Sequence, residues 1–332
     1  QFHHSILDGW SVASFITELN NLYLKLQEEP LFKPEKLKIN YKNFVIQQEI
    51  GKSDQFAHQF WKNELLEYTR LDLFTDEQQL ESYKFSLGKD FLKKLKESRT
   101  LFKADIKVVS FSAYLYMLKI LSSSSEIVSG IVTHNRPECE DGDKVLGCFL
   151  NTIPFKIDIE NDINCIDYIK KVNNKLVKLK EFESLNVLEI SRATNERPAN
   201  GNPFFDMFFN FIDFHIFNEL DGTEKEEYEN NLTGTLDSIR TNYYCDFTVT
   251  CTLDSYDVLV QYTKQPKCQF SPKQMASLFI NILESIIKDP YDNIGSLNYL
   301  SESEELSLLK LSSPAVKFAI KETVLDRFSE QV

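Results

Sequence analysis

The first residues of the chain hold the side chains that are best suited to chemistry. His3 and His4 are adjacent, and Asp8 and Gly9 follow in the run HHSILDG. Histidine titrates near neutral pH and can take a proton from an attacking amine or hydroxyl group. Asp8 can hold a tight loop through hydrogen bonds or cap the next helix, and Gly9 relieves the steric limit where the loop becomes that helix. The segment therefore predicts a general base on a loop.

Two other interpretations of the histidine pair stay open at this level. A pair of histidines in a loop can be structural or incidental. A zinc site would need a third ligand, and none is apparent, because His58, His134 and His215 lie in unrelated segments. The cysteines form no CxxC pair and none stands near a histidine at metal-ligand spacing. We therefore expect no metal.

Helical periodicity predicts the element that comes after this loop. An apolar face indicates a helix over residues 11–26, with members Val12, Phe15, Ile16, Leu19, Leu22, Tyr23 and Leu26. Further helices are expected over residues 54–66, 89–99, 110–121 and 166–179. Ser271 is expected to cap a last helix that has Pro272 at its first position and stops before Pro290.

Strands are expected between these helices. Residues 127–133 predict a buried strand in which Gly130 marks a close approach. Residues 146–159 predict a loop that runs into a strand, and residues 204–214 predict a central strand that is apolar on both faces. Residues 243–252 and 258–263 predict a hairpin. Residues 219–230 are expected to form an acidic surface loop, and the polar stretch from Ser301 onward a linker.

Composition narrows the class of protein. The chain has 332 residues, 42% hydrophobic content and a net charge of −13. An acidic balance argues against nucleic acid as a partner, because phosphate binding needs clustered Lys and Arg. No apolar run reaches the ~18 residues of a membrane span. We expect a cytoplasmic protein that does not act at a membrane, and the start at Gln1 suggests a piece of a longer chain.

The run His3–Gly9 resembles the HHxxxDG motif of the condensation-domain superfamily of nonribosomal peptide synthetases, which shares the chloramphenicol acetyltransferase fold. Later segments resemble the same family in order: residues 41–44 its YxDFxxW segment, with Asn43 in place of Asp and Gln47 in place of Trp; residues 60–62 its YW helix; residues 146–152 its GxFxNT motif; and residues 202–208 its NPLFxVMF strand. Residues 183–185 do not reproduce its QDxPF segment. Residues 323–332 resemble the opening of an adenylation domain.

The resemblance implies an α/β fold. The family forms a V of two acetyltransferase-like subdomains, each a mixed sheet with flanking helices, with a tunnel between them. Residues 1–30 would end the N-terminal subdomain with the catalytic motif and its helix. Residues 31–300 would form the C-terminal subdomain, and residues 301–332 a linker and the start of an adenylation domain. Most of the N-terminal subdomain would be missing, so we expect this piece alone to be inactive, with its apolar tunnel face exposed.

The resemblance also implies the reaction. An acceptor aminoacyl amine attacks a donor acyl thioester, and both groups are carried on phosphopantetheine arms of carrier domains, with no cofactor bound directly. His4 would be the catalytic residue, and His3, Asp8 and Gly9 would support the motif loop. Asp8 would pair with an arginine in the missing half. Asn151 and Thr152 would either shape the tunnel at the crossover between subdomains or form a strand-edge turn through side-chain hydrogen bonds. Partners would be upstream and downstream peptidyl carrier domains and the adjacent adenylation domain.

Three alternatives stay open within and beyond this superfamily. An epimerization domain also carries HHxxxDG, but Phe149, Asn151 and the adenylation-like end argue against it. A coenzyme A-dependent acyltransferase would not be expected to run on into such an end. A non-catalytic docking domain would usually have a degraded motif. A heterocyclization domain has DxxxxD instead, so His3 and His4 exclude it.

Overall fold

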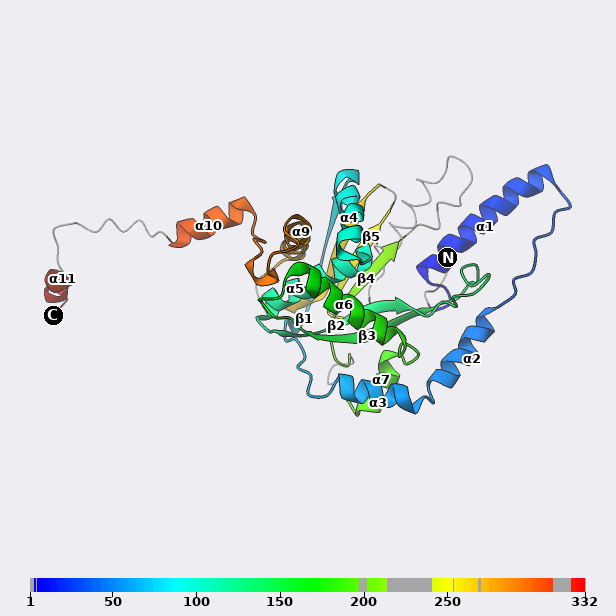
Figure 1. Cartoon of the computed structure of the whole chain (residues 1–332), viewed down its shortest axis with the longest axis horizontal. Coiled ribbons are helices and arrows are strands. Elements are labelled where there is room, and N and C mark those ends of the chain that lie inside the picture. Colours follow the sequence, from blue (N-terminus) through cyan, green and yellow to red (C-terminus); the bar gives the residue numbers. More distant parts are fainter. Residues whose placement is uncertain are drawn as a thin grey trace. The chain divides into compact units, whose positions relative to one another are not determined.

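The computed structural model describes residue 3 and residues 5–196, 202–213, 241–252, 254–267, 270–312 and 324–331. The chain divides into two compact units, Gln1–Leu297 and Asn298–Val332. The first unit contains a sheet with flanking helices, and the second contains helices α10 (Glu302–Ser312) and α11 (Val324–Glu330) (Figure 1). The helix α10 lies within the stretch that was predicted as a linker.

A mixed sheet forms the centre of the first unit. Its order is β1-β6-β5-β4-β2-β3. The strands are β1 (Phe74–Leu87), β2 (Glu126–His134), β3 (Leu150–Asp158), β4 (Met207–Asp213), β5 (Cys245–Cys251) and β6 (Tyr256–Pro266). Strands β2, β4 and β5 run parallel, and the other neighbours pair antiparallel. The carboxyl ends of β2, β4 and β5 therefore meet at one edge, where open α/β sheets usually place ligands. This mixed α/β fold confirms the predicted class.

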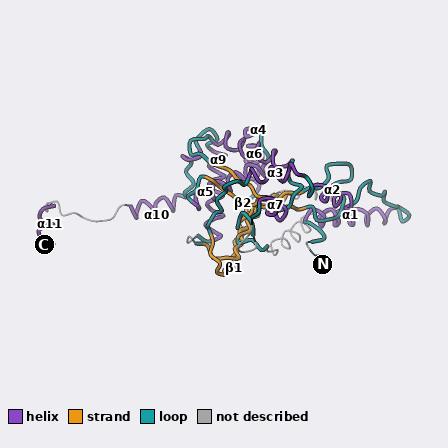
Figure 2. The backbone as a smooth tube through the Cα atoms, turned by 90° about the horizontal axis from the view of Figure 1, so that it is seen from below, coloured by secondary structure: helices purple, strands orange, loops and turns teal. Residues whose placement is uncertain are grey.

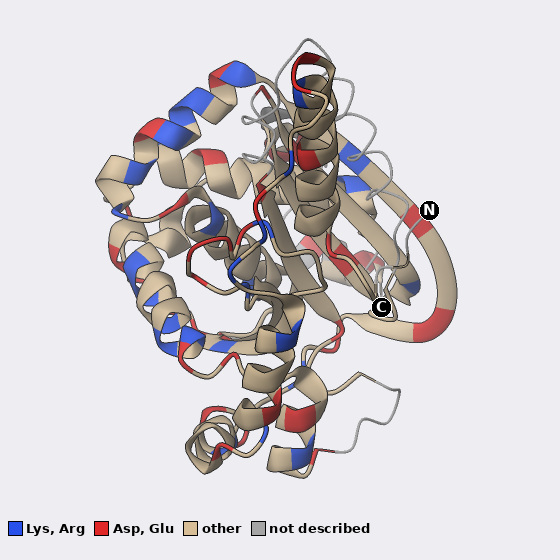
Figure 3. Ribbon diagram, turned by 90° about the vertical axis from the view of Figure 1, so that its right-hand side faces the viewer, with Lys and Arg blue, Asp and Glu red and all other residues tan. Residues whose placement is uncertain are grey.

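Helices flank the sheet. They are α1 (Gly9–Glu28), α2 (Tyr41–Gly51), α3 (Gln55–Glu64), α4 (Lys89–Phe102), α5 (Ile106–Ser122), α6 (Cys165–Lys180), α7 (Val187–Thr194) and α9 (Pro272–Lys288). Ser271 and Gln274 form a capping box at the start of α9, as the sequence predicted for Ser271. Helices α5 and α9 contact each other and the sheet (Figure 2). Charged residues of both signs line the outer helices (Figure 3).

The two faces of the central strands differ. On one face, the ring of Phe209 packs 5.3 Å from Phe111 of α5, and the ring of Phe247 packs 4.9 Å from Phe279 of α9. Strand residues alternate between faces, so Asn210 of β4 points the opposite way, into a cavity. Phe208 and Ile212 lie on the same face as Asn210, so between Phe208 and Ile212 the central strand is apolar on both faces, as predicted, except at Asn210.

The start of β4 also differs from the prediction, for a steric reason. Phe204 has a φ of 67°, in the left-handed region, which ends extended structure before Met207. The ring of Phe205 lies against Gly130, where an added Cβ would stand 2.3 Å from Phe205 Cε2. This contact confirms that Gly130 marks a close approach.

Helix α1 buries only part of its apolar face. The helix was predicted, and Val12 is 8% exposed. Phe15 and Leu19 are 47% and 55% exposed. Within the described residues, no helix is long and apolar enough to cross a membrane. The predicted acidic loop of residues 219–230 lies outside the described residues.

Candidate active site

The motif loop folds into a turn before α1. Ile6 N donates to the His3 carbonyl oxygen at 2.9 Å, and His3 Nδ1 lies 2.7 Å from Ser5 Oγ. His3 is exposed, and His4 lies outside the described residues. Asp8 caps α1 in extended conformation and accepts from Ser11 N at 2.7 Å. The predicted capping role of Asp8 is confirmed, and Gly9 is the first residue of the helix.

Asp8 is the anchor of this loop. Its Oδ2 accepts from Phe149 N at 3.0 Å, and its own N–H donates to the Gly147 carbonyl at 3.1 Å. Arg136 Nη2 donates to both carboxylate oxygens, at 3.2 and 3.3 Å. The side chains of Asp8 and Arg136 are only 3% and 8% exposed. The arginine partner of Asp8 therefore lies in this chain and not in a missing half, which corrects the prediction.

Arg136 also ties the loop before β3 to the start of α1. Its Nη1 donates to the Val145 carbonyl at 2.6 Å, and its Nη2 donates to Ser11 Oγ at 2.8 Å. The guanidinium lies 4.1 Å above the Phe149 ring. Burial lowers the pKa of Arg136, and the charge of Asp8 opposes that effect. The sequence analysis missed Arg136, and the available signal was a lone arginine just after a buried strand.

Three segments singled out in the sequence meet at Gly147. Ser11 Oγ donates to the Gly147 carbonyl at 2.7 Å, and Tyr41 OH donates to the Cys148 carbonyl at 2.8 Å. The Tyr41 ring fills the space beside Gly147, where an added Cβ would stand 2.1 Å from Tyr41 Cδ2. The rings of Tyr41 and Phe149 pack edge to face at 5.2 Å. The motif loop, the start of α2 and the loop before β3 thus form one packed unit.

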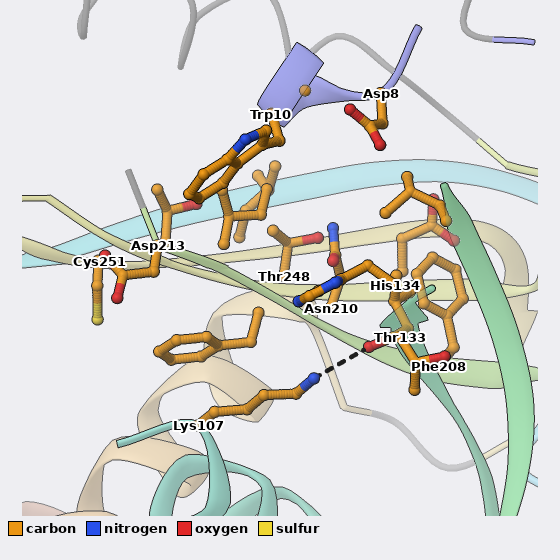
Figure 4. A pocket seen from close by; sticks show the side chains of 18 of the residues that line it. Asp8, Trp10, Lys107, Thr133, His134, Phe208, Asn210, Asp213, Thr248 and Cys251 are labelled. Atoms are coloured by element: carbon orange, nitrogen blue, oxygen red, sulfur yellow. Dashed lines mark hydrogen bonds between the residues drawn. The ribbon is translucent and has the colours of Figure 1, made fainter. Parts of the chain in front are cut away.

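A cavity of about 920 Å³ opens beside this unit. Asp8, Gly9 and Trp10 line it at the motif loop, and it extends over the carboxyl ends of β2, β4 and β5. Figure 4 shows Asp8 and Trp10 on one side of the cavity and Lys107 on the other, with Asn210 and Thr248 between them. The volume lies within the ~300–1,000 Å³ typical of ligand sites. The cavity can therefore hold a substrate next to the motif loop.

Asn151 and Thr152, the two residues expected at the crossover between subdomains, have different surroundings in the structure. Thr152 lines the cavity. Asn151 donates its amide group to the carbonyls of Glu183 and Leu185, at 2.8 and 3.0 Å, and does not line the cavity. Asn151 therefore fixes the segment before α7. This segment includes the residues that did not reproduce the family pattern.

Three titratable groups near the end of β2 have shifted pKa values. Burial lowers the pKa of Lys107, and burial together with the charge of Lys107 lowers the pKa of His134. Burial raises the pKa of Glu183. Such shifts cluster at functional sites but also occur in structural networks. In the part of the chain that the structure describes, no group of His, Cys, Asp or Glu is arranged to hold a metal ion.

Comparison with known families and proteins agrees with this geometry. A family model described as the condensation domain matches residues 1–309. One subunit of the linear gramicidin synthase of Brevibacillus parabrevis is 23% identical over 99% of this chain and 4% of its own length. Gramicidin S synthase 2 of Brevibacillus brevis is 26% identical over 58% of this chain, again 4% of its own length. The chain thus spans a small fraction of these relatives.

Solved structures share the fold. The condensation domain from the monacolin K polyketide synthase superposes with a TM-score of 0.70 at 16% identity, covering 88% of this chain and 70% of that chain. The first condensation domain of the calcium-dependent antibiotic synthetase gives a TM-score of 0.67 at 13% identity, covering 90% of this chain and 66% of that one. At such low identity these matches show the fold alone.

Proposed function

Because the chain belongs to the condensation-domain family of nonribosomal peptide synthetases, we propose that it forms an amide bond between two carrier-bound substrates. The acceptor amine attacks the carbonyl carbon of the donor thioester. A C–N bond forms, the C–S bond breaks, and the donor arm leaves as a thiol. The observation that carries this proposal is the buried Asp8–Arg136 pair, which fixes the Asp8–Gly9 end of the HHxxxDG motif at a substrate-sized cavity.

In this proposal His4 is the catalytic residue. It orients the acceptor amine and takes its proton as the C–N bond forms, and the proton then reaches the leaving thiol. Amine attack on a thioester is already favourable, so holding the two reactants close supplies a large part of the rate. Asp8 and Gly9 set the path of the loop that carries His4. His3 supports the same loop through its contact with Ser5.

The substrates arrive on phosphopantetheine arms of an upstream and a downstream peptidyl carrier domain. The arms belong to the substrates, and the chain needs no cofactor of its own. An adjacent adenylation domain supplies one of the aminoacyl groups. The hydroxyl and amide side chains of Thr152, Asn210 and Thr248 line the cavity and can bond to the amide groups of such an arm. The epimerization, coenzyme A and docking alternatives are not favoured by the family match.

A single-turnover assay tests the proposal. The natural full-length protein is combined with carrier domains loaded with a donor and an acceptor aminoacyl group, and dipeptidyl thioester is measured. We expect His4→Ala to lower the rate by ~100-fold or more, the scale of a positioned acid–base group. His58→Ala is the matched control, because His58 bonds to the Lys52 carbonyl at 2.9 Å and does not line the cavity. Equal rates for both variants would remove His4 from the mechanism.

A further inference from the structure

Lys107 is a cation inside the cavity that the proposed reaction does not use. It lies in the first turn of α5, lines the cavity and is partly buried. Its Nζ donates to the Val132 carbonyl at 3.3 Å, a long hydrogen bond. Among the contacts of the described residues, no carboxylate forms an ion pair with it within 4.0 Å. An ammonium group has three donors, so two remain available.

The position of Lys107 is costly for the protein. The first turn of a helix is the positive end of its dipole, where a cation is disfavoured. Burial lowers the pKa of Lys107, and the charge of Glu183 offsets this only in part and from beyond ion-pair distance. A partly buried cation is stable when an anion reaches it. The local structure therefore favours a negatively charged ligand at this end of the cavity.

A second cation, on a different helix, lines the same cavity. Lys96 of α4 is exposed and lines the cavity. Burial raises the pKa of Cys251 at the end of β5, and the nearby charge of Lys96 opposes that rise. Lys96 forms no ion pair within the described part of the chain. Arg99, one turn further on, is instead paired with Asp105. Lys96 and Lys107 are thus cavity cations without carboxylate partners among the described residues.

We propose that Lys107, with Lys96, forms a subsite for a carboxylate on the side chain of an acyl substrate. The cavity then selects a substrate with an acidic side chain, such as an aspartyl or glutamyl group. The inference rests on the proposed function, because the cavity that Lys107 lines also borders Asp8 and Gly9 of the motif loop. The ammonium groups donate hydrogen bonds to the carboxylate oxygens, and the carboxylate supplies the charge that Lys107 lacks.

The first test is binding, which does not depend on turnover. N-acetylcysteamine thioesters of N-acetyl-aspartate and of N-acetyl-asparagine are nearly the same size and differ in side-chain charge. Their affinities for the natural full-length protein are measured by calorimetry. We expect the aspartyl thioester to bind roughly ten- to a hundredfold more tightly, the range of a hydrogen bond to a charged group. Equal affinities would overturn the proposal.

Substitutions test whether Lys107 causes the preference for the aspartyl over the asparaginyl thioester. Lys107→Met should remove the preference for the aspartyl probe, and Lys107→Arg should keep most of it. Lys96→Met is an exposed change that tests the subsite even if Lys107→Met fails to fold, and it should reduce the preference. Lys94→Met is the matched control, because Lys94 is exposed on α4 and does not line the cavity. If Lys107→Met weakens both probes equally, the cation binds a common part of the ligands and the proposal fails.

Turnover then separates this inference from the proposed function. Aspartyl, asparaginyl and leucyl groups are loaded on the donor carrier and, separately, on the acceptor carrier. Product from all three without an aspartyl preference at either position would refute the carboxylate subsite and leave amide formation standing. No product from any pair, together with selective aspartyl binding, would refute the proposed reaction and leave the subsite standing.

Discussion

Arg136 Nη2 donates to both carboxylate oxygens of Asp8, at 3.2 and 3.3 Å, and joins residues 128 positions apart in the sequence. Both side chains are almost fully buried. Removal of one partner leaves a buried charge unpaired, which typically costs about 3–5 kcal/mol. We expect Asp8→Asn and Arg136→Met each to lower the free energy of unfolding on that scale, measured by urea denaturation.

A double-mutant cycle tests whether the charges of Asp8 and Arg136 stabilise the fold together or independently. The combined Asp8→Asn and Arg136→Met variant should be less destabilised than the sum of the single variants. The exposed pair of Lys38 and Glu140 is the control, with side chains 64% and 72% exposed. Loss of Lys38 should cost less than about 1 kcal/mol. Additive costs at Asp8 and Arg136 would show that the two charges do not depend on each other.

Gly147→Ala tests the packed unit around the motif loop. The new Cβ would stand 2.1 Å from Tyr41 Cδ2, so the ring or the loop must move. Overpacking of this kind typically costs about 1–3 kcal/mol. Gly88→Ala is the matched control, because an added Cβ there meets no atom within 4 Å. We expect a lower urea midpoint for Gly147→Ala and a much smaller change for Gly88→Ala. Similar losses would mean that Tyr41 does not restrict this position.

Local patterns predicted much of this fold. Helical periodicity identified α1, α5 and α6, and the cap and proline signals placed the start of α9 at the correct residue. The hairpin of β5 and β6 was also predicted. Strand β1 was missed because it is mostly exposed, so its sequence lacks the apolar alternation that marks a strand. Helix α2 was missed because few of its residues are buried.

The site was predicted only where its residues are close in sequence. Asp8 and Gly9 belong to one short motif, and the capping role of Asp8 follows from local geometry. The pairing of Asp8 with Arg136 depends on how the end of β2 meets the motif loop. The place of Lys107 depends on how α5 borders the opposite side of the cavity. Helical periodicity and capping patterns concern residues a few positions apart, so they cannot show a contact between residues 128 positions apart. The resemblance placed the arginine in the wrong part of the protein for the same reason.

Asn151→Asp tests the anchor of the segment before α7. The Asn151 amide group donates to the carbonyls of Glu183 and Leu185, and a carboxylate cannot donate and would repel both oxygens. An unsatisfied buried group typically costs about 1–3 kcal/mol. We expect a loss of that order in the free energy of unfolding at pH 7. Asn63→Asp, an exposed change on α3, should have little effect. Equal effects of the two changes would contradict the anchoring role.

The lowered pKa of His134 should make the free energy of unfolding depend on pH. Burial lowers its folded-state pKa, with further contributions from the charges of Lys107 and Arg136, while Asp8 acts in the opposite direction. The unfolded chain titrates near the ordinary value of about 6.5. Above that pH both states are neutral and stability is complete. As the pH falls toward the lowered folded-state pKa, the unfolded state binds protons first and stability is lost.

The variant His134→Gln isolates this effect, because Gln does not titrate. The ring keeps accessible surface where it faces the cavity, so solvent screens part of the shift and we expect a modest difference. Urea unfolding of the parent and of His134→Gln at pH 7.5, 6 and 5 measures it. The parent should lose stability relative to the variant only below about pH 6.5. Glu183 titrates in both proteins and cancels in the difference, so a constant gap at all three pH values would show that His134 has an ordinary pKa in the folded state.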